Sequence, residues 1–191
     1  MSPFEELVAE IKTEFPRFRI VEKRNSALSR IIDLFLKVLT FGAQCEFMTR
    51  YHTVLWDTLY VPDQWETTPD VARLVTLHHE RVHLRQRRRY GDVLMTFLYL
   101  VPFFPLGLAY GRARIEWEAY VETIRATARY RGLSEAHSRE LREHIVRQFT
   151  SGAYGWMWPF PKIIGRWYDA ALAEVEKDQA PKEPRAPAPR A

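Results

Sequence analysis

The chain of 191 residues is 47% hydrophobic and 14% aromatic, which is enough apolar surface for one core and favours a single domain. Its 28 basic and 24 acidic residues are mostly interspersed, as on a solvated surface, which argues against nucleic-acid binding despite a pI near 9.3. Cys45 is the single cysteine, which excludes an internal disulfide. The acidic, amphipathic first residues lack the basic start and apolar run of a signal peptide, so we expect a cytoplasmic protein.

The first third of the chain predicts both helices and strands. Apolar residues at helical spacing predict one helix over residues 4–15 and a second over 26–41. A short strand is expected over 17–21. Residues 51–61 are rich in Thr, Val, Leu, Trp and Tyr and predict a longer strand. Together with the helices that follow, these segments predict an α+β fold that is mainly helical and has a small sheet.

Four helices are expected in the rest of the chain, over residues 69–90, 112–131, 134–150 and 162–177. The first should begin at Thr68, whose hydroxyl can cap the free backbone N–H groups, and should end at Gly91. Its arginine run over 85–89 is interpreted as a solvated helix end that complements the helix dipole. Residues 179–191 are rich in proline and charge and predict a disordered tail, which leaves 1–178 as the domain.

The helix expected over 69–90 contains the sequence His79-Glu80-x-x-His83. Two histidines four residues apart project from the same side of a helix, so both imidazoles can reach one metal ion. Glu80 lies about 100° round the helix, where it can hold and deprotonate a water on the metal. Arg81 falls on the opposite side, so its charge would not point at the metal. The alternative is that His79 and His83 are ordinary helix histidines with solvent or carboxylate partners.

A catalytic zinc site needs a third protein ligand, and the helix expected over 112–131 offers an acidic one. Glu116 shares its face mostly with small residues, as close approach to another helix requires. Glu118 and Glu122 share the opposite face with arginines, where they should form a ladder of surface ion pairs. Glu116 is therefore the expected ligand. Two alternatives stay open: Glu116 pairs with Arg112 four residues away, or the helix is rotated and Glu118 is the ligand.

These two motifs together resemble the gluzincin type of zinc metallopeptidase, which carries HExxH on one helix and a glutamate on the next. The segment Glu116-Trp-Glu-Ala119-Tyr120 is similar to the E-x-x-A-D signature of the minimal gluzincins and of membrane-embedded prenyl-protein and heat-shock peptidases. The resemblance covers roughly residues 53–127.

That resemblance implies a zincin-like fold, with the small sheet packed against the active-site helix, and a peptide or protein substrate. It implies that His79, His83 and Glu116 bind Zn²⁺ and that Glu80 is the general base. The chain departs from the signature at Tyr120, where the family has an aspartate that orients a ligand histidine, so another group or the tyrosine hydroxyl must take that role. The alternative is a non-catalytic zinc-binding or membrane-peripheral protein that keeps the fold.

No residue is clearly marked to polarise the carbonyl group of a substrate. The side chains that offer a donor are Tyr110, Tyr120, His144 and Tyr154.

Residues 93–111 carry no formal charge and reach the length of a membrane span. A single crossing would place His83 and Glu116 on opposite sides of a bilayer about 30 Å thick, whereas a shared metal ion holds its ligands within a few Å. We therefore expect a helical hairpin that turns over 102–107. This hairpin is either buried in the core or in peripheral contact with a membrane, helped by the aromatic residues of 156–160.

Overall fold

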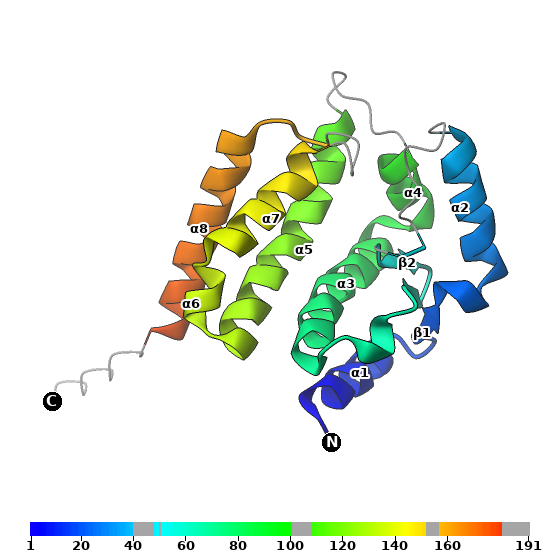
Figure 1. Ribbon diagram of the computed structural model, residues 1–191, viewed down its shortest axis with the longest axis horizontal. Coiled ribbons are helices and arrows are strands. Elements are labelled where there is room, and N and C mark those ends of the chain that lie inside the picture. The colour runs from blue at the N-terminus through cyan, green and yellow to red at the C-terminus, as the bar shows by residue number, and fades with distance from the viewer. Residues whose placement is uncertain (40–47, 50, 101–107, 152–156, 181–191) are drawn as a thin grey trace, which may run out of the picture.

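The computed structural model describes residues 1–39, 48–49, 51–100, 108–151 and 157–180, and Figure 1 shows how its elements are arranged. The α-helices are α1 (Pro3–Glu14), α2 (Ala27–Leu39), α3 (Asp70–Tyr90), α4 (Asp92–Leu100), α5 (Leu108–Arg131), α6 (Leu133–Ala136), α7 (Arg139–Thr150) and α8 (Pro161–Gln179). The strands are β1 (Arg19–Glu22), β2 (Thr53–Leu55) and β3 (Thr58–Val61), and the 3-10 helices are η1 (Lys23–Asn25) and η2 (Trp65–Thr67). The expected α+β class, mainly helical with a small sheet, is confirmed.

The three strands form one mixed sheet in the order β1-β3-β2. β1 runs parallel to β3 and pairs Ile20 with Leu59, whereas β2 runs antiparallel to β3 and pairs Val54 with Leu59. The single strand expected over 51–61 is therefore wrong, because the chain turns back at Trp56. This residue is the one described non-glycine residue with a left-handed backbone, at φ 51°. The turn contains neither the glycine nor the asparagine that such a conformation favours, so the sequence does not predict a turn at this position.

A first core joins α1, the sheet and α3. The Ser2 hydroxyl accepts a hydrogen bond from the Glu5 N–H, and the Glu5 carboxylate accepts one from the Ser2 N–H, which starts α1 firmly. The buried apolar side chains of this core are Leu7, Ile11, Phe15, Phe18, Leu59, Val61, Trp65, Leu74, Leu77 and Leu84. They fix α3, which carries the HExxH segment, against the sheet.

Glu14, at the end of α1, ties that helix to α3. Its carboxylate accepts hydrogen bonds from Arg85 at 2.8 and 2.9 Å and from Arg81 at 3.0 Å, and Arg88 lies 3.5 Å away. Arg85 first, and then Arg81, lower the pKa of Glu14 to about 2. Arg81 thus faces away from the two histidines, as expected. The interpretation of the arginine run as a solvated end is wrong in part, because Arg85 and Arg88 join two helices and Arg87 binds the start of α4.

Glu14→Gln is expected to lower the free energy of unfolding by about 1–2 kcal/mol at neutral pH, since solvent screens part of the attraction to these partly exposed arginines. The pKa of Glu14 is about 2 in the folded protein, against an ordinary value of 4.5. Its contribution is therefore fully present above pH 4.5 and is lost as the pH falls toward 2. Urea denaturation of both proteins at a series of pH values measures the difference. Glu10→Gln is the control, because Glu10 is exposed and bonds to Arg81 alone among the described residues. Equal losses in the two variants, or a difference that does not shrink in acid, would contradict this account.

Helices α5 to α8 form a second core on the other side of the molecule (Figure 1). The single helix expected over 134–150 is wrong. α6 ends at Ala136, and α7 begins after Ser138, whose hydroxyl accepts a hydrogen bond from the Leu141 N–H. The Tyr168 hydroxyl of α8 donates to the Ala136 carbonyl at this break. A serine favours an N-cap over a helix interior, which explains why the helix divides here.

Of the two predicted ends of α3, the C-terminal end is confirmed and the N-terminal cap is wrong. The helix stops at Gly91, whose φ of 79° lies in the left-handed region, as expected. Its N-cap is Pro69 and not Thr68, because the Thr68 hydroxyl donates to the Gln64 carbonyl in the preceding 3-10 turn.

Several other expectations meet the limits of the described residues. The end of the second helix at residues 40–41, the hairpin turn over 102–107 and the tail from residue 181 onward lie outside the described residues. α8 extends to Gln179, one residue into the expected tail. None of the helices in the described ranges has the length and apolar character needed to span a bilayer.

Candidate metal centre

α3 and α5 pack against each other and bring His79, His83 and Glu116 together. One atom able to bind a metal from each residue lies within 4.8 Å of the other two. The Nε2 atoms of the histidines are 3.2 Å apart, and the Glu116 Oε2 atom lies 3.9 Å from His79 Nε2 and 3.7 Å from His83 Nε2. His83 and Glu116 are buried, and His79 is partly buried. The three residues that the sequence singles out as ligands thus form one compact group that could hold a metal ion.

The other acidic residues of α5 are placed elsewhere. Glu118, the alternative ligand, accepts a hydrogen bond from Gln86 Nε2 at 2.8 Å and does not belong to the metal-binding group. Glu122 lies 3.6 Å from Arg125 and 3.5 Å from His78, and the His78 hydrogen bond is the main cause of its lowered pKa. The ladder of ion pairs expected for these two glutamates is therefore confirmed only for Glu122 with Arg125.

The hydrogen bonds behind the imidazoles determine which ring nitrogens carry hydrogen. The Thr123 hydroxyl donates its one hydrogen to the Ala119 carbonyl, at 3.2 Å. Its oxygen lies 2.9 Å from His79 Nδ1 and, with the hydroxyl hydrogen donated to the carbonyl, accepts a hydrogen bond from that nitrogen. His79 consequently carries its hydrogen on Nδ1 and a lone pair on Nε2.

Gln86 fixes His83 in the same way. Its side-chain nitrogen donates to the Ile115 carbonyl at 2.9 Å and to the Glu118 carboxylate at 2.8 Å, which settles the orientation of the amide. The amide oxygen then accepts from His83 Nδ1 at 2.9 Å. His83 therefore also has a lone pair on Nε2.

With both imidazoles neutral and hydrogen on each Nδ1, the two Nε2 lone pairs face each other across 3.2 Å. A cation placed between them would remove the repulsion and satisfy both nitrogens. Donor atoms around a tetrahedral zinc ion, at about 2.0–2.1 Å from it, lie about 3.3 Å apart, which is close to the observed separation. Burial is the largest cause that lowers the pKa of His79, to about 3, so this imidazole stays neutral as a metal ligand must. Two imidazoles and one carboxylate fit a divalent transition metal.

Thr123→Val is expected to weaken zinc binding about 10- to 100-fold, because it removes the acceptor for His79 Nδ1 at nearly constant shape. Competition with a chromogenic zinc chelator measures the affinity. Thr127→Val is the matched control, since Thr127 is also buried on α5 but lies one turn further from the ligands. Equal affinities for the two variants would show that the hydroxyl does not orient the imidazole.

Glu80 interacts by charge both with the metal-binding group and with the buried Lys23. Burial raises the pKa of Glu80 to about 7; His83 opposes this rise, Glu116 adds to it and Lys23 opposes it. Lys23, which begins η1 directly after β1, is fully buried, and this burial lowers its pKa to about 7 against the attraction of Glu80 and Asp33. Burial lowers the pKa of His52 to about 4, and the charge of Lys23 adds to that effect. The candidate general base is therefore buried and lies within the influence of both the metal-binding group and Lys23.

Three of these residues are not expected from the sequence. Gln86 follows His83 by three residues and so shares its helix face, a spacing that would have identified it. Thr123 shares the face of Glu116 two turns further along α5. Lys23 comes from a separate element, and no spacing relates it to Glu80.

The residues considered for polarising a substrate carbonyl are widely placed. The Tyr120 ring contacts the His79 ring, with centroids 4.8 Å apart. Tyr110 is exposed and packs on a tryptophan, and His144 is exposed on α7. Tyr154 lies outside the described residues. Tyr120 is thus the one described candidate in contact with the metal-binding group.

Comparison with protein-family models, with curated proteins and with solved structures finds no match for this chain. The function therefore rests on the geometry of the site.

Proposed function

We propose that the chain is a zinc metallopeptidase of the gluzincin type with a zincin-like fold, in which His79, His83 and Glu116 bind the zinc ion. The observation that carries this proposal is the close approach of the two imidazole Nε2 atoms, 3.2 Å apart, beside the buried Glu116 carboxylate. The placement of the HExxH helix beside a small sheet, and of the glutamate on the next long helix, supports the proposal further.

The proposed reaction is hydrolysis of an amide bond in a peptide or protein. A bound zinc ion supplies a Lewis acid that lowers the pKa of water toward about 7. Glu80, next to His79 but about 100° round the helix, accepts the proton of the attacking water and passes it to the departing amide nitrogen. Its burial raises the pKa to about 7, which suits a group that must both take and release a proton, and a neighbouring cation would lower that pKa again.

The test uses the purified full-length chain and a mixed peptide library whose cleavage is followed by mass spectrometry. We expect about one zinc ion per chain by elemental analysis, loss of cleavage after treatment with a chelator, and recovery on addition of zinc. A chain that binds no zinc, or cleavage that survives complete removal of metal, would overturn the proposal.

A further inference from the structure

The exposed side of α4 is apolar. After Asp92 the helix has the sequence VLMTFLYL, which contains no charged residue. Met95 is buried, whereas Val93 is 85% exposed and Leu94 and Phe97 are also exposed. A helix that is apolar on all sides is expected in a core or in contact with lipid, not at a water-facing surface.

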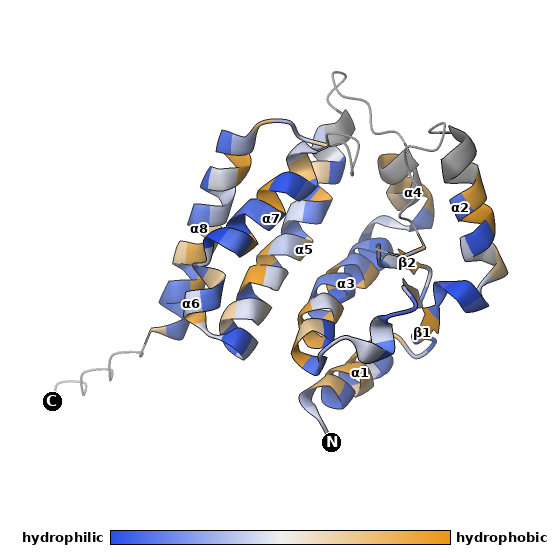
Figure 2. Cartoon of the chain, in the orientation of Figure 1, coloured by the Kyte–Doolittle hydropathy of each residue, from blue (hydrophilic) through white to orange (hydrophobic). Residues whose placement is uncertain are grey.

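α2 has inverted polarity. Its inward side carries Ser29 and Asp33, which are buried, and Asp33 stabilises the charge of buried Lys23. Its outward side carries Ile31 and Leu34, each 64% exposed. Surface helices of globular proteins show the opposite arrangement. In Figure 2, α2 and α4 lie at the same end of the molecule and both contain apolar residues. Among these, Ile31 and Leu34 of α2 and Val93, Leu94 and Phe97 of α4 are exposed.

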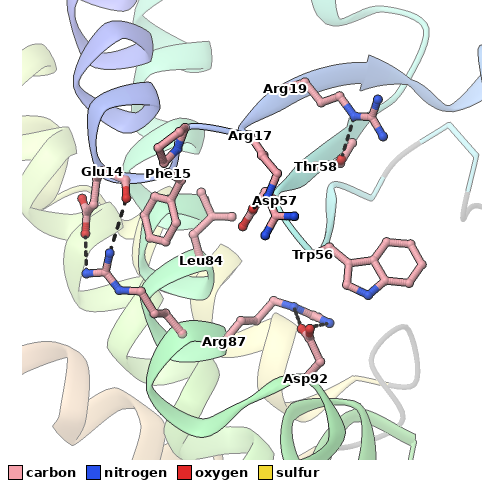
Figure 3. Close-up of a pocket in the computed structure, with 12 residues that line it drawn as sticks. Glu14, Phe15, Arg17, Arg19, Trp56, Asp57, Thr58, Leu84, Arg87 and Asp92 are labelled. Carbon is pink, nitrogen blue, oxygen red and sulfur yellow. Dashed lines mark hydrogen bonds and ion pairs between the residues drawn. The ribbon is translucent and has the colours of Figure 1, made fainter.

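A pocket rich in arginine lies at the start of α4. It has a volume of about 950 Å³ and lies between the end of α1, the start of β1, the β2–β3 turn and the last turns of α3 (Figure 3). Its charged lining consists of four arginines, Arg17, Arg19, Arg87 and Arg88, and three carboxylates, Glu14, Asp57 and Asp92. Trp56, 59% exposed, lies at this pocket in its left-handed turn.

Two of the pocket arginines, Arg17 and Arg19, are loosely held. Arg17 is almost fully exposed and lies 3.5 Å from Asp57. Arg19 bonds to the Thr58 hydroxyl, a neutral partner (Figure 3). Guanidinium groups in such a setting can turn to an external phosphate at little cost, because weak exposed ion pairs contribute little.

We propose that the outward faces of α2 and α4, together with Trp56 and the arginine pocket, form a docking surface for an anionic lipid membrane. The aliphatic and aromatic side chains enter the boundary between headgroups and acyl chains, where tryptophan is favoured, and the arginines bind the lipid phosphates. The combination of charge-free helix faces with adjacent arginines is what selects an anionic bilayer over a protein partner. Docking is peripheral and does not require the metal.

The test is co-sedimentation of the full chain with phosphatidylcholine vesicles that contain about 30% phosphatidylserine, beside vesicles of phosphatidylcholine alone. We expect binding to the anionic vesicles that is about tenfold or more stronger and that weakens with added salt. Val93→Gln combined with Phe97→Gln should reduce binding about tenfold or more to both kinds of vesicle. Arg17→Gln combined with Arg19→Gln should reduce it about tenfold on the anionic vesicles alone. Circular dichroism checks that each variant is folded.

Two control variants make changes of the same kinds elsewhere on the molecule, one apolar and one basic. Val71→Gln alters an exposed valine at the other end of α3, and Arg139→Gln combined with Arg166→Gln removes two exposed charges from α7 and α8. Both should bind like the original chain. The proposal is overturned if the arginine control loses as much affinity as the pocket variant, since net charge alone would then explain binding. It is also overturned if the α4 variant binds vesicles as tightly as the original chain. It is overturned as well if the original chain does not bind vesicles but self-associates in light scattering, and the α4 variant loses this self-association.

Discussion

Replacing Glu80 with glutamine should lower kcat for peptide hydrolysis by about 1,000-fold while the zinc content stays unchanged. The amide has nearly the same size as the carboxylate, but it cannot accept the proton of the attacking water. Glu80 lies outside the group formed by His79, His83 and Glu116, so its replacement leaves the metal ligands in place. Steady-state kinetics on a cleaved library peptide, with elemental analysis of the same sample, measures both quantities.

Glu122→Gln is the control for this experiment. Glu122 is also a glutamate near the α3–α5 contact, but its partners are His78 and Arg125. Its replacement should leave kcat within a few-fold of the original value. If Glu80→Gln kept full activity, Glu80 would not be the general base. If neither the variant nor the original chain hydrolysed peptides although both held zinc, the non-catalytic alternative would be favoured.

Glu116→Gln should weaken zinc binding by at least about 100-fold. The reason is that removal of groups which merely orient a ligand already costs about 10- to 100-fold, and Glu116 is itself a proposed ligand and supplies its negative charge. The exchange also leaves the two imidazole lone pairs facing each other with a neutral neighbour, which adds no attraction for a cation. Competition with a chromogenic chelator gives the affinity, and peptide cleavage should fall in parallel.

Glu118→Gln distinguishes between the two glutamates that the sequence offers. Glu118 accepts a hydrogen bond from Gln86 and does not belong to the metal-binding group, so its replacement should weaken zinc binding much less than that of Glu116. A larger loss for Glu118→Gln than for Glu116→Gln would mean that α5 is rotated when the metal is bound.

Features that follow from helical periodicity are predictable from this sequence. The four-residue spacing of His79 and His83 places both on one face, and the same periodicity selects Glu116 over Glu118 on the next helix. A period of 3.6 residues is a property of the chain itself, so it survives whatever surrounds the helix. The three residues do meet in the structure.

Features that depend on distant partners are not predictable in this way. Lys23 of η1 and Glu80 of α3 influence each other's pKa although no sequence spacing relates them, and Asp33 on the inward side of α2 stabilises the charge of that lysine. The arginine run looks like any solvated helix end until Glu14 is placed beside it. The division of 51–61 into two strands depends on a Trp56 conformation that its residue type disfavours.

Gln86 of α3 binds α5 through the Ile115 carbonyl and Glu118, and it also holds His83 of its own helix, with protein atoms alone. The contact between the two helices is therefore stabilised without a metal ion, unlike in a zinc finger, where metal binding drives folding. Removal and reloading of the ion should then leave the rest of the molecule undisturbed, with amide hydrogen exchange along both helices equally slow in the stripped and the reloaded protein.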